Sequence, residues 1–598
     1  MTAATTLDLG VIGNGQVAAL LAPPARLAWL CLPRFDGDPV FNALLQDPAA
    51  PTARGTFDVE IDEIGELQRC YRRNTAVLET RLEDRKGNRL QVVDFCPRFQ
   101  ERGRIFHPAM VVRALLPEQG TPMVRVRIRP EFQWGSERPI VTAGAHHISY
   151  RFGDAAFRIT TNASITALIE ERAFCLREPV WLLLGPDETV EQAPERLGLS
   201  FLQDTTSYWS EWVRGLAIPF EWQDAVIRAA ITLKLCTFED TGAIVAALTT
   251  SIPEAADSGR NWDYRYCWLR DSYFVIQELN RLGATRTMES YVDYLLNVAM
   301  REAGGEIQPL FGISGARHLD EREIHTLPGY RGMGPVRVGN AAYTQRQNDA
   351  YGAIVLAATH AFFDRRLARP GDAALFRSLE EIGERAVRLA LEPDAGPWEL
   401  RGSMHVHTFP AVMCWAACDR LARIAHRFDA PQRADHWARA AARLRSGILE
   451  LAWRPQRGSL SSVLDGERLD ATLLLLPELG FLPHTDPRMR ATVEVLGREL
   501  RRGSYLMRYT DGDDFGTPQN AFLVASFWFV NALADMGQPS RAREMFEELL
   551  RRRTPLGLLA EHVDPVSGEL WGNFPQTFSM VGILASARRL SASWEDSL

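Results

Sequence analysis

The sequence contains few cysteines, and their arrangement suggests neither a metal site nor a redox motif. Its 598 residues include only eight cysteines, at positions 31, 70, 96, 175, 236, 267, 414 and 418. No two of them form a CxxC pair, and none lies at metal-ligand spacing from a histidine. We therefore expect free thiols and no bound metal ion.

Long apolar segments are also missing. No run of about 18 apolar residues occurs, so no membrane-spanning helix is expected. Residues 1–30 lack the basic start, continuous apolar stretch and cleavage site of a secretory signal. Together with the scattered cysteines, these absences predict a cytoplasmic protein without a membrane partner.

There is no excess of basic charge. The chain has 67 lysines and arginines against 75 aspartates and glutamates, and no long basic run, which argues against a nucleic-acid partner. An apolar fraction of 46% and a charged fraction of 24% are typical of a folded globular protein. Because the chain is longer than one hydrophobic core usually allows, we expect two domains.

The first third of the chain has the alternating pattern of β-strands. Residues 80–99 and 146–165 read as hairpins that turn at Lys86-Gly87-Asn88 and at Gly153-Asp154, and residues 110–132 read as a further pair of strands. Repeated hairpins without helices between them predict an antiparallel β-sandwich over residues 1–205.

Helical spacing follows, for example in residues 272–300, 434–453 and 540–553. We expect a helical linker over residues 206–235 and a large all-α domain over 236–598. Long connections rich in glycine and proline, such as residues 563–576, interrupt the helices. Connections of this kind usually carry function.

Residues 13–18, GNGQVA, formally match a dinucleotide-binding fingerprint, and Asp36 lies about twenty residues further on. A helix long enough to carry a pyrophosphate cannot follow, because Pro23-Pro24 end the run. We therefore expect a structural turn here, and no cofactor.

The segment RNWDYRYCWLRDSYF, residues 260–274, combines arginines and aspartates with many aromatic residues. Its alternation predicts an extended lead-in over 262–268 and a helix that starts near Arg270, with Asp271 in its first turn. A buried Arg270–Asp271 pair beside the indole of Trp262 can offer hydrogen bonds and an apolar face to a sugar. A purely structural ion pair is the alternative.

Two glutamates stand beside aromatic residues in separate loops. Glu399 follows Trp398, and a carboxyl group against an indole is an environment that raises its pKa. Glu561 precedes a turn-rich loop. Hydrolysis of a glycosidic bond needs such a pair, one group to protonate the leaving oxygen and one to activate water. His405 and His407, two residues apart, are predicted to line the pocket or to hydrogen-bond within the loop rather than to bind metal.

Several motifs then point to a known family. The stretches LAWLCLPRFDGDPVF, NWDYRYCWLRDS, PVRVGNAAYTQRQNDAYG, WELRG and EHVDPVSGELWGNFPQTFS resemble, in order and spacing, the bacterial branch of glycoside hydrolase family fifteen. That branch includes glucoamylases, trehalases and glucodextranases. The resemblance implies an N-terminal β-sandwich followed by an (α/α)6 barrel, which makes the chain an α+β multidomain protein.

The resemblance also implies roles for particular residues. Glu399 matches the general acid and Glu561 the general base of an inverting exo-acting hydrolase that releases β-D-glucose. The residues expected to bind a small α-glucoside are Arg270, Asp271, Trp398, Arg401, Trp262, Trp29, Arg34 and Asp36. The last three belong to the N-terminal loop motif.

The substrate is the least determined part of the prediction. Trehalose is the leading expectation, with oligosaccharides joined by α-1,4 or α-1,6 links as the alternative, and a non-catalytic carbohydrate-binding protein as a further one. Gln519-Asn520 stand where the family often has Glu-Gly, and Met580 where it often has His. These departures bear on specificity rather than on the two glutamates.

Overall fold

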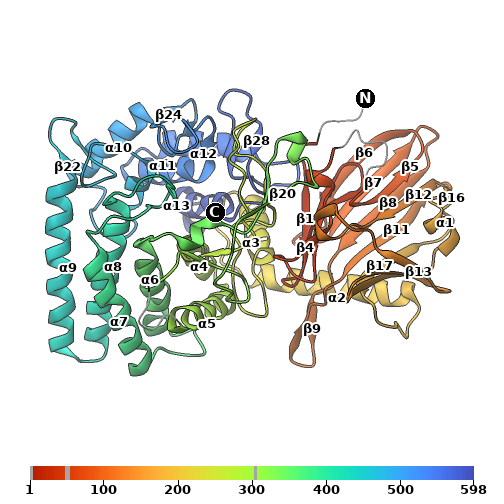
Figure 1. Ribbon diagram of the computed structural model, residues 1–598, viewed down its shortest axis with the longest axis horizontal. Coiled ribbons are helices and arrows are strands. Elements are labelled where there is room, and N and C mark those ends of the chain that lie inside the picture. Colours follow the sequence, from red (N-terminus) through yellow and green to blue (C-terminus); the bar gives the residue numbers. More distant parts are fainter. Residues whose placement is uncertain (1–4, 48–53, 302–305, 598) are drawn as a thin grey trace.

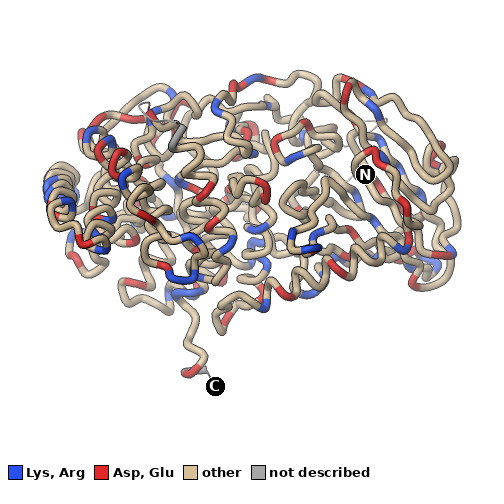
Figure 2. Tube along the Cα trace, turned by 90° about the horizontal axis from the view of Figure 1, so that it is seen from below, with Lys and Arg blue, Asp and Glu red and all other residues tan. Residues whose placement is uncertain are grey.

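The computed structural model describes residues 5–47, 54–301 and 306–597. A β-rich N-terminal domain is followed by a helical C-terminal domain (Figure 1). Acidic and basic residues are interspersed along both domains (Figure 2). Within these described ranges, no helix is both long enough and apolar enough to cross a membrane.

Two antiparallel sheets build the N-terminal domain. The first sheet contains β1 (Gly10–Gly13), β2 (Ala18–Ala22), β3 (Arg26–Leu32), β4 (Asp38–Phe41), β5 (Thr56–Ile61), β12 (Met123–Arg129) and β16 (Phe174–Cys175). The second contains β6 (Ile64–Tyr71), β7 (Leu78–Asp84), β8 (Arg89–Phe95), β11 (Val111–Gln119), β13 (Ile140–Ala143), β14 (His147–Phe152), β15 (Ala155–Thr161) and β17 (Val180–Pro186). Apolar side chains of both sheets pack into one shared layer.

Two of the predicted strand pairs are confirmed, and the third is wrong. Strands β7 and β8 pair across Lys86-Gly87-Asn88, and β14 and β15 pair across Gly153-Asp154. Strands β11 and β12, by contrast, do not pair with each other. β11 pairs with β8 and β17, whereas β12 pairs with β5 and β16 in the other sheet. The chain crosses between sheets at Gly120, where φ is +66°, and the apolar alternation of both strands serves the same shared layer.

The glycine-rich stretch near the N-terminus is a β-hairpin. Gly13 pairs with Ala18, and Asn14 N donates to Val17 O at 3.1 Å, which closes the turn between β1 and β2. No helix begins there. The predicted structural turn is therefore present.

A buried ion pair joins the two sheets. Arg113 on β11 donates to Asp94 Oδ1 at 2.7 Å, and also to the carbonyl oxygens of Phe57 and Ala25 at 2.5 and 2.8 Å. The side chains of Arg113 and Asp94 have no exposed surface. Because Phe57 lies on β5 of the first sheet and Ala25 immediately before β3, the guanidinium bridges the domain core.

Twelve elements of the C-terminal domain form two layers. Six of them contact one another in a closed cycle: α4 (Leu269–Arg281), α6 (Asp349–Phe363), α8 (Thr408–Arg427), the short 3-10 helix η5 (Ala471–Leu475), α11 (Leu523–Asp535) and α13 (Thr577–Leu590). Each is backed by one further helix, in the same order α5 (Thr285–Arg301), α7 (Ala373–Leu389), α9 (Pro431–Ala452), α10 (Pro487–Glu499), α12 (Pro539–Arg551) and α3 (Gln223–Leu235).

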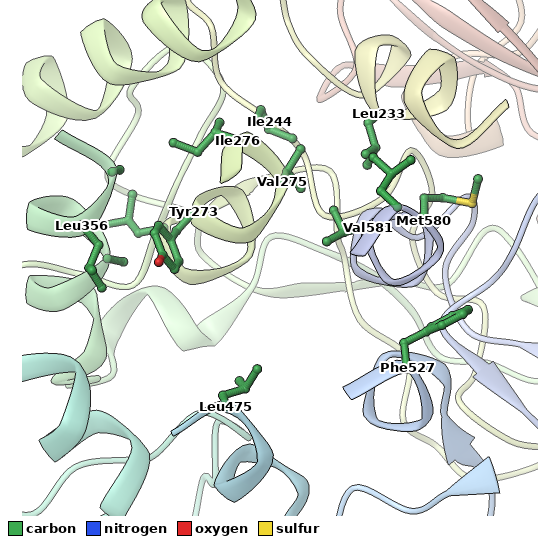
Figure 3. Packing of buried hydrophobic residues seen from close by; sticks show 14 of the residues in the cluster. Leu233, Ile244, Tyr273, Val275, Ile276, Leu356, Leu475, Phe527, Met580 and Val581 are labelled. Atoms are coloured by element: carbon green, nitrogen blue, oxygen red, sulfur yellow. The ribbon is translucent and has the colours of Figure 1, made fainter. Parts of the chain in front are cut away.

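The sequence explains which helices are central. Helix α6, DAYGAIVLAATHAFF, is apolar around almost its whole circumference and is buried on nearly every side. Helix α12 instead buries only the stripe of residues 542, 545, 546, 549 and 550. Figure 3 shows side chains from several central elements turned toward one another, among them Tyr273 of α4, Leu356 of α6 and Leu475 of η5.

The predicted helical segments are also present. Residues 272–300 are divided between α4 and α5 at Gly283, where φ is +91°. Between the domains, α2 (Pro194–Arg214) packs on strands β17 and β9 (Phe99–Glu101), whereas α3 packs on α13. The chain therefore passes from one domain to the other between α2 and α3.

We expect Arg113→Met to lower the stability of the N-terminal domain by roughly 3–5 kcal/mol, because it leaves the buried Asp94 carboxylate without its cation. The double variant Arg113→Met/Asp94→Leu should recover much of that loss. Calorimetric unfolding and urea titration followed by tryptophan fluorescence measure the change.

The matched control is Arg81→Met, which breaks the exposed pair with Glu118. It should cost less than about 1 kcal/mol. A loss from Arg113→Met no larger than from this control would contradict the bridging role of Arg113.

Candidate active site

A cavity opens among the loops at one end of the helical domain. It brings together seven of the sequence-predicted residues, namely Trp262, Arg270, Asp271, Trp398, Glu399, Arg401 and Glu561. Its apolar floor is formed by Phe274, Leu475, Trp528 and Phe578. Charged and aromatic side chains from loops far apart in sequence thus share one site.

The alternation in residues 262–270 separates two surfaces. Cys267–Trp268 form a short strand, β18, and α4 begins at the next residue with Asp271 in its first turn, as predicted. The side chains of Trp262, Tyr264, Trp268 and Arg270 line the cavity.

The intervening residues point the other way. Asp263 and Arg265 are fully buried and form a two-bonded ion pair, at 2.9 and 2.7 Å. Arg265 also donates to the carbonyl oxygen of Gly37 at 2.6 Å and lies over the ring of Trp134, both from the N-terminal domain. The mixed composition of this segment therefore has two causes. One set of side chains lines the cavity, and the other set fixes the segment to the N-terminal domain.

Glu399 lies in a tight loop. Its φ of +60° is unusual for a residue with a side chain, and such strain is common at functional positions. Trp268 Nε1 donates to Glu399 Oε1 at 2.6 Å, and Gln347 Nε2 does so at 3.4 Å. Burial raises the pKa of the Glu399 carboxyl above its usual value, although Arg270, 3.5 Å away, partly opposes this.

Arg270 lines the cavity next to Glu399 and contacts several other polar side chains there. It donates to Asp349 Oδ2 at 2.8 Å and to Gln347 Oε1 at 3.0 Å. Its Nε lies 3.7 Å from Asp271 Oδ1. Burial raises the pKa of Asp271 to about 7, with Arg270 opposing and the carboxylates of Glu399 and Glu561 adding to the increase. Protonated and ionised carboxyl groups can therefore coexist here near neutral pH.

Glu561 is held from another direction. It lies immediately before the short strand β27 (His562–Val563) and is only 3% exposed. The hydroxyl of Tyr264 donates to Glu561 Oε1 at 2.8 Å. Gly572 passes so close that a Cβ there would lie 2.7 Å from Glu561 Cβ, and its φ is +82°. Glycine is therefore required at this position.

A loop at residues 511–516, the mouth loop, borders the cavity. Arg260 pairs with Asp513 at 2.8 and 2.5 Å, and the backbone N–H groups of Arg401 and Gly402 donate to Asp514 Oδ2 at 2.6 and 2.9 Å. Phe515 meets Trp262 edge to face, with ring centroids 5.1 Å apart. The mouth loop is thereby tied to the loop that carries Glu399.

Arg401 covers the indole of Trp262, with its Cζ 4.5 Å from the ring centroid, and pairs with Glu321 at 3.0 and 2.7 Å. Trp398 packs against Phe522, with centroids 5.9 Å apart. A guanidinium group and two indole rings therefore lie among the cavity-lining residues, which suits a ligand with hydroxyl groups and apolar C–H faces.

Three predicted residues do not line the cavity. Trp29 is fully buried on β3, where its Nε1 donates to Leu248 O at 2.8 Å, and thus packs between the domains. Arg34 pairs with Asp36 at 3.0 Å, with much of the Arg34 side chain in solvent. The N-terminal loop motif instead contacts the segment that carries the site residues, because the carbonyl oxygen of Gly37 accepts a hydrogen bond from Arg265.

The departures from the family pattern also lie outside the cavity. Met580 is fully buried in the core, on α13, which packs against α3 (Figure 3). Gln519 is exposed, and Asn520 Nδ2 donates to the carbonyl oxygen of Glu254 at 2.8 Å. None of the three contributes to the cavity lining.

The two neighbouring histidines are loop residues outside the cavity. His405 Nδ1 lies 3.3 Å from Asp465 Oδ2, and His407 is buried. Over the ranges that the structure describes, no group of three or more His, Cys, Asp or Glu side chains is arranged to hold a metal ion.

Sequence reasoning did not assign a role to several cavity residues: Glu254, Arg260, Tyr264, Trp268, Gln345, Arg508, Asp513 and Phe515. The alternation that singled out Trp262 could also have indicated Tyr264 and Trp268, since all three share one face. Arg508 and Asp513 carry no local signal. Only the path of the chain brings them to the cavity.

The arrangement can perform acid–base chemistry. One carboxyl group, Glu399, is surrounded by donors and has a raised pKa, and a second, Glu561, approaches the same cavity from another loop. A bound molecule between them could receive a proton from one and have a water activated by the other.

Comparison with known proteins agrees with this chemistry. The family profile described as "Glycosyl hydrolases family 15" matches residues 222–588, and the profile "Trehalase-like, N-terminal" matches residues 2–142. A trehalase of Mycobacterium tuberculosis is 31% identical over 96% of this chain and 88% of its own length. A trehalase of Thermoplasma volcanium is 30% identical over 97% and 93%, respectively.

Among solved structures, a bacterial glucoamylase complexed with acarbose superposes with a TM-score of 0.71 over 98% of this chain and 94% of its own. At 13% identity this likeness concerns the fold alone, a β-sheet domain followed by a helical domain. Together, the family profile over most of the helical domain and the relatives along nearly the whole length show that the chain is a glycoside hydrolase and belongs to family 15 of the glycosyl hydrolases.

Proposed function

We propose that this protein hydrolyses trehalose with inversion at the anomeric carbon, with Glu399 as general acid and Glu561 as general base. The observation that carries the proposal is the shared cavity of these two glutamates: Glu399 has a raised pKa, and Glu561 accepts a hydrogen bond from the hydroxyl of Tyr264. Glu399 protonates the glycosidic oxygen, and Glu561 takes a proton from water attacking the opposite face.

The remaining cavity residues bind the sugar. Arg270 and Asp271 hydrogen-bond hydroxyl groups of the terminal glucose, and Trp398 packs beside the acid. Trp262 and Arg401, which lie against each other at the mouth, contact the leaving sugar. The ligand is a small α-glucoside, because both glutamates lie in one cavity bounded by the mouth loop rather than on an open surface.

The choice of trehalose is supported by the relatives, which are named trehalases and align along nearly the whole chain. The same geometry would also suit an intracellular glucoamylase or oligosaccharide α-glucosidase, for which the glucoamylase structure gives support only at the level of fold. Binding without catalysis would require a substituted acid or base, and both glutamates are present.

We also propose that the helical domain is an (α/α)6 barrel and the N-terminal domain a β-sandwich. The closed cycle of six elements, each backed by one helix, and the apolar layer between two sheets support this. The chain passes between the domains at residues 215–222, inside the predicted linker 206–235, but α3 (Gln223–Leu235) packs on α13 and so counts with the helical domain rather than with a linker. A cytoplasmic location and the absence of nucleic-acid and membrane partners remain predictions.

Proton NMR of trehalose hydrolysis tests the proposed reaction. Inversion should yield β-glucose from the attacked ring and α-glucose from the leaving ring, in equal initial amounts. Glu399→Gln and Glu561→Gln should each lower kcat by a factor of roughly 10² or more, because each removes a proton-transfer group while keeping its shape.

Asp465→Asn, which changes a carboxylate outside the cavity, is the control and should retain wild-type rates. Parallel assays with maltose and maltotriose measure whether the protein hydrolyses the alternative substrates. Two α-glucose molecules per trehalose at early times, or a Glu561→Gln variant with near-normal turnover, would contradict the proposal.

The proposal also fixes the direction of a pH effect. The general acid must be protonated, so activity is lost as pH rises through the pKa of Glu399, which burial has raised. Trp268 Nε1–H favours the ionised form of Glu399. We therefore expect Trp268→Phe to shift the alkaline limb of the kcat profile to higher pH while lowering kcat itself.

Stopped assays across the pH range, with saturating trehalose, measure this shift. Trp594→Phe, an exposed tryptophan remote from the cavity, is the control. An alkaline limb that stays in place or moves to lower pH would show that Trp268 does not act on the acid.

A further inference from the structure

A third buried glutamate lies beside the candidate base and has no part in the reaction just described. Glu254 lines the cavity and is 6% exposed, and between it and Glu561 lies His562, which is 1% exposed. Arg508 completes this group. We refer to Glu254, Arg508 and His562 as the base-support cluster.

The imidazole of His562 has a fixed orientation. Its ring stacks on Phe522, with centroids 5.1 Å apart and an interplanar angle of 21°. Arg508 Nη1 approaches His562 Nε2 at 3.4 Å, and a guanidinium nitrogen can only donate. Nε2 therefore accepts this hydrogen bond, and the ring proton is on Nδ1.

That proton faces the base. His562 Nδ1 lies 3.3 Å from Glu561 Oε2, within ion-pair distance but outside hydrogen-bond geometry, and has no hydrogen-bond partner among the described residues. Tyr264 already donates to the other carboxylate oxygen, Oε1. Each oxygen of Glu561 thus has one protein donor near it, which leaves one lone pair on each for a substrate water.

Glu254 in turn fixes Arg508. The two pair at 2.8 Å through Glu254 Oε2, and Trp262 Nε1 donates to Glu254 Oε1 at 3.0 Å. Although burial acts to raise the pKa of Glu254, the guanidinium groups of Arg508 and Arg260 act to lower it, and the net shift is downward, so its carboxyl stays ionised. The Asn520 amide, a departure from the family pattern, holds its backbone carbonyl.

We propose that His562 is a positioning residue that orients Glu561 through its Nδ1–H, and that Glu254 and Arg508 fix the imidazole for this task. The proposal rests on the proposed role of Glu561 as the base. The other titratable or charged groups around Glu561 and the cluster are Tyr264, Asp271, Glu399, Arg260 next to Glu254, and Tyr509 next to Arg508.

Two substitutions of His562 separate positioning from simple loss of structure. The amide nitrogen of His562→Asn can occupy the place of Nδ1, whereas that of His562→Gln reaches only the place of Nε2. We expect His562→Gln to lower kcat for trehalose roughly 10- to 100-fold, as for a misplaced catalytic group, with KM changed by less than about threefold. His562→Asn should recover most of the lost rate.

The acidic limb of the pH–rate profile gives a second readout. Removal of a donor to the ionised base in His562→Gln should move this limb to higher pH. Glu254→Gln keeps an oxygen that can accept from Arg508 but removes a negative charge near the base, so it should move the same limb to lower pH. A purely structural role would not produce opposite shifts.

His484→Gln is the matched control, since it also breaks a histidine–carboxylate contact, with Asp535 at 3.0 Å, at a distance from the cavity. Equal rates in His562→Asn and His562→Gln, or shifts of the acidic limb in the same direction for His562→Gln and Glu254→Gln, would overturn the proposal. If circular dichroism shows that His562→Gln does not fold, the test rests on Glu254→Gln and His562→Asn. An acidic limb that does not move in Glu254→Gln would then reject the positioning role of His562.

The wild-type enzyme distinguishes this failure from failure of the proposed function. No hydrolysis of trehalose, maltose or maltotriose by wild type would reject the proposed function itself. An active wild type whose Glu561→Gln variant is inactive, but whose His562 variants behave alike, would reject only the positioning role.

Discussion

The buried ion pair between Asp263 and Arg265 is the contact on which the site depends. It lies on one side of an extended segment, residues 262–268, whose other side presents Trp262, Tyr264 and Trp268 to the cavity. Arg265 also binds the carbonyl of Gly37 and lies over Trp134. The helical domain therefore carries Glu399 and Glu561. The N-terminal domain holds in place the extended segment that donates a hydrogen bond to each of these carboxylates.

The two glutamates differ through their surroundings rather than their chemistry. Glu399 combines burial, a strained backbone and a nearby guanidinium, whereas Glu561 receives a phenolic hydroxyl and faces an imidazole. Both accept a hydrogen bond from the extended segment of residues 262–268, Glu399 from Trp268 and Glu561 from Tyr264. Any displacement of that segment would affect both glutamates together.

Much of this could be predicted from sequence. Strand alternation, helical spacing and the order of five motifs predicted a β-rich domain before a helical one and the seven cavity residues, both glutamates among them. Motif similarity could not separate residues that contact the cavity from those that pack behind it, so Trp29, Arg34 and Asp36 were grouped with the others. The pairing of β11 with β12 failed because alternation reports which face is buried, not which strand lies alongside.

Other residues carry no readable signal. Arg508 and Glu254 are ordinary charged residues in their local sequence, and only the return of the chain to the same end of the domain makes them neighbours. His562 was visible only as the residue after a candidate base. Long-range assembly of this kind depends on tertiary packing rather than on local pattern.

The close approach of Gly572 to Glu561 has a bearing on redesign of the pocket. No side chain fits behind the base, so the walls on that side cannot be reshaped by substitution without moving Glu561. The mouth loop is different, since the side chain of Phe515 is partly in solvent. Variation that admits larger or differently linked sugars therefore has room at the entrance of the cavity and none at its catalytic end.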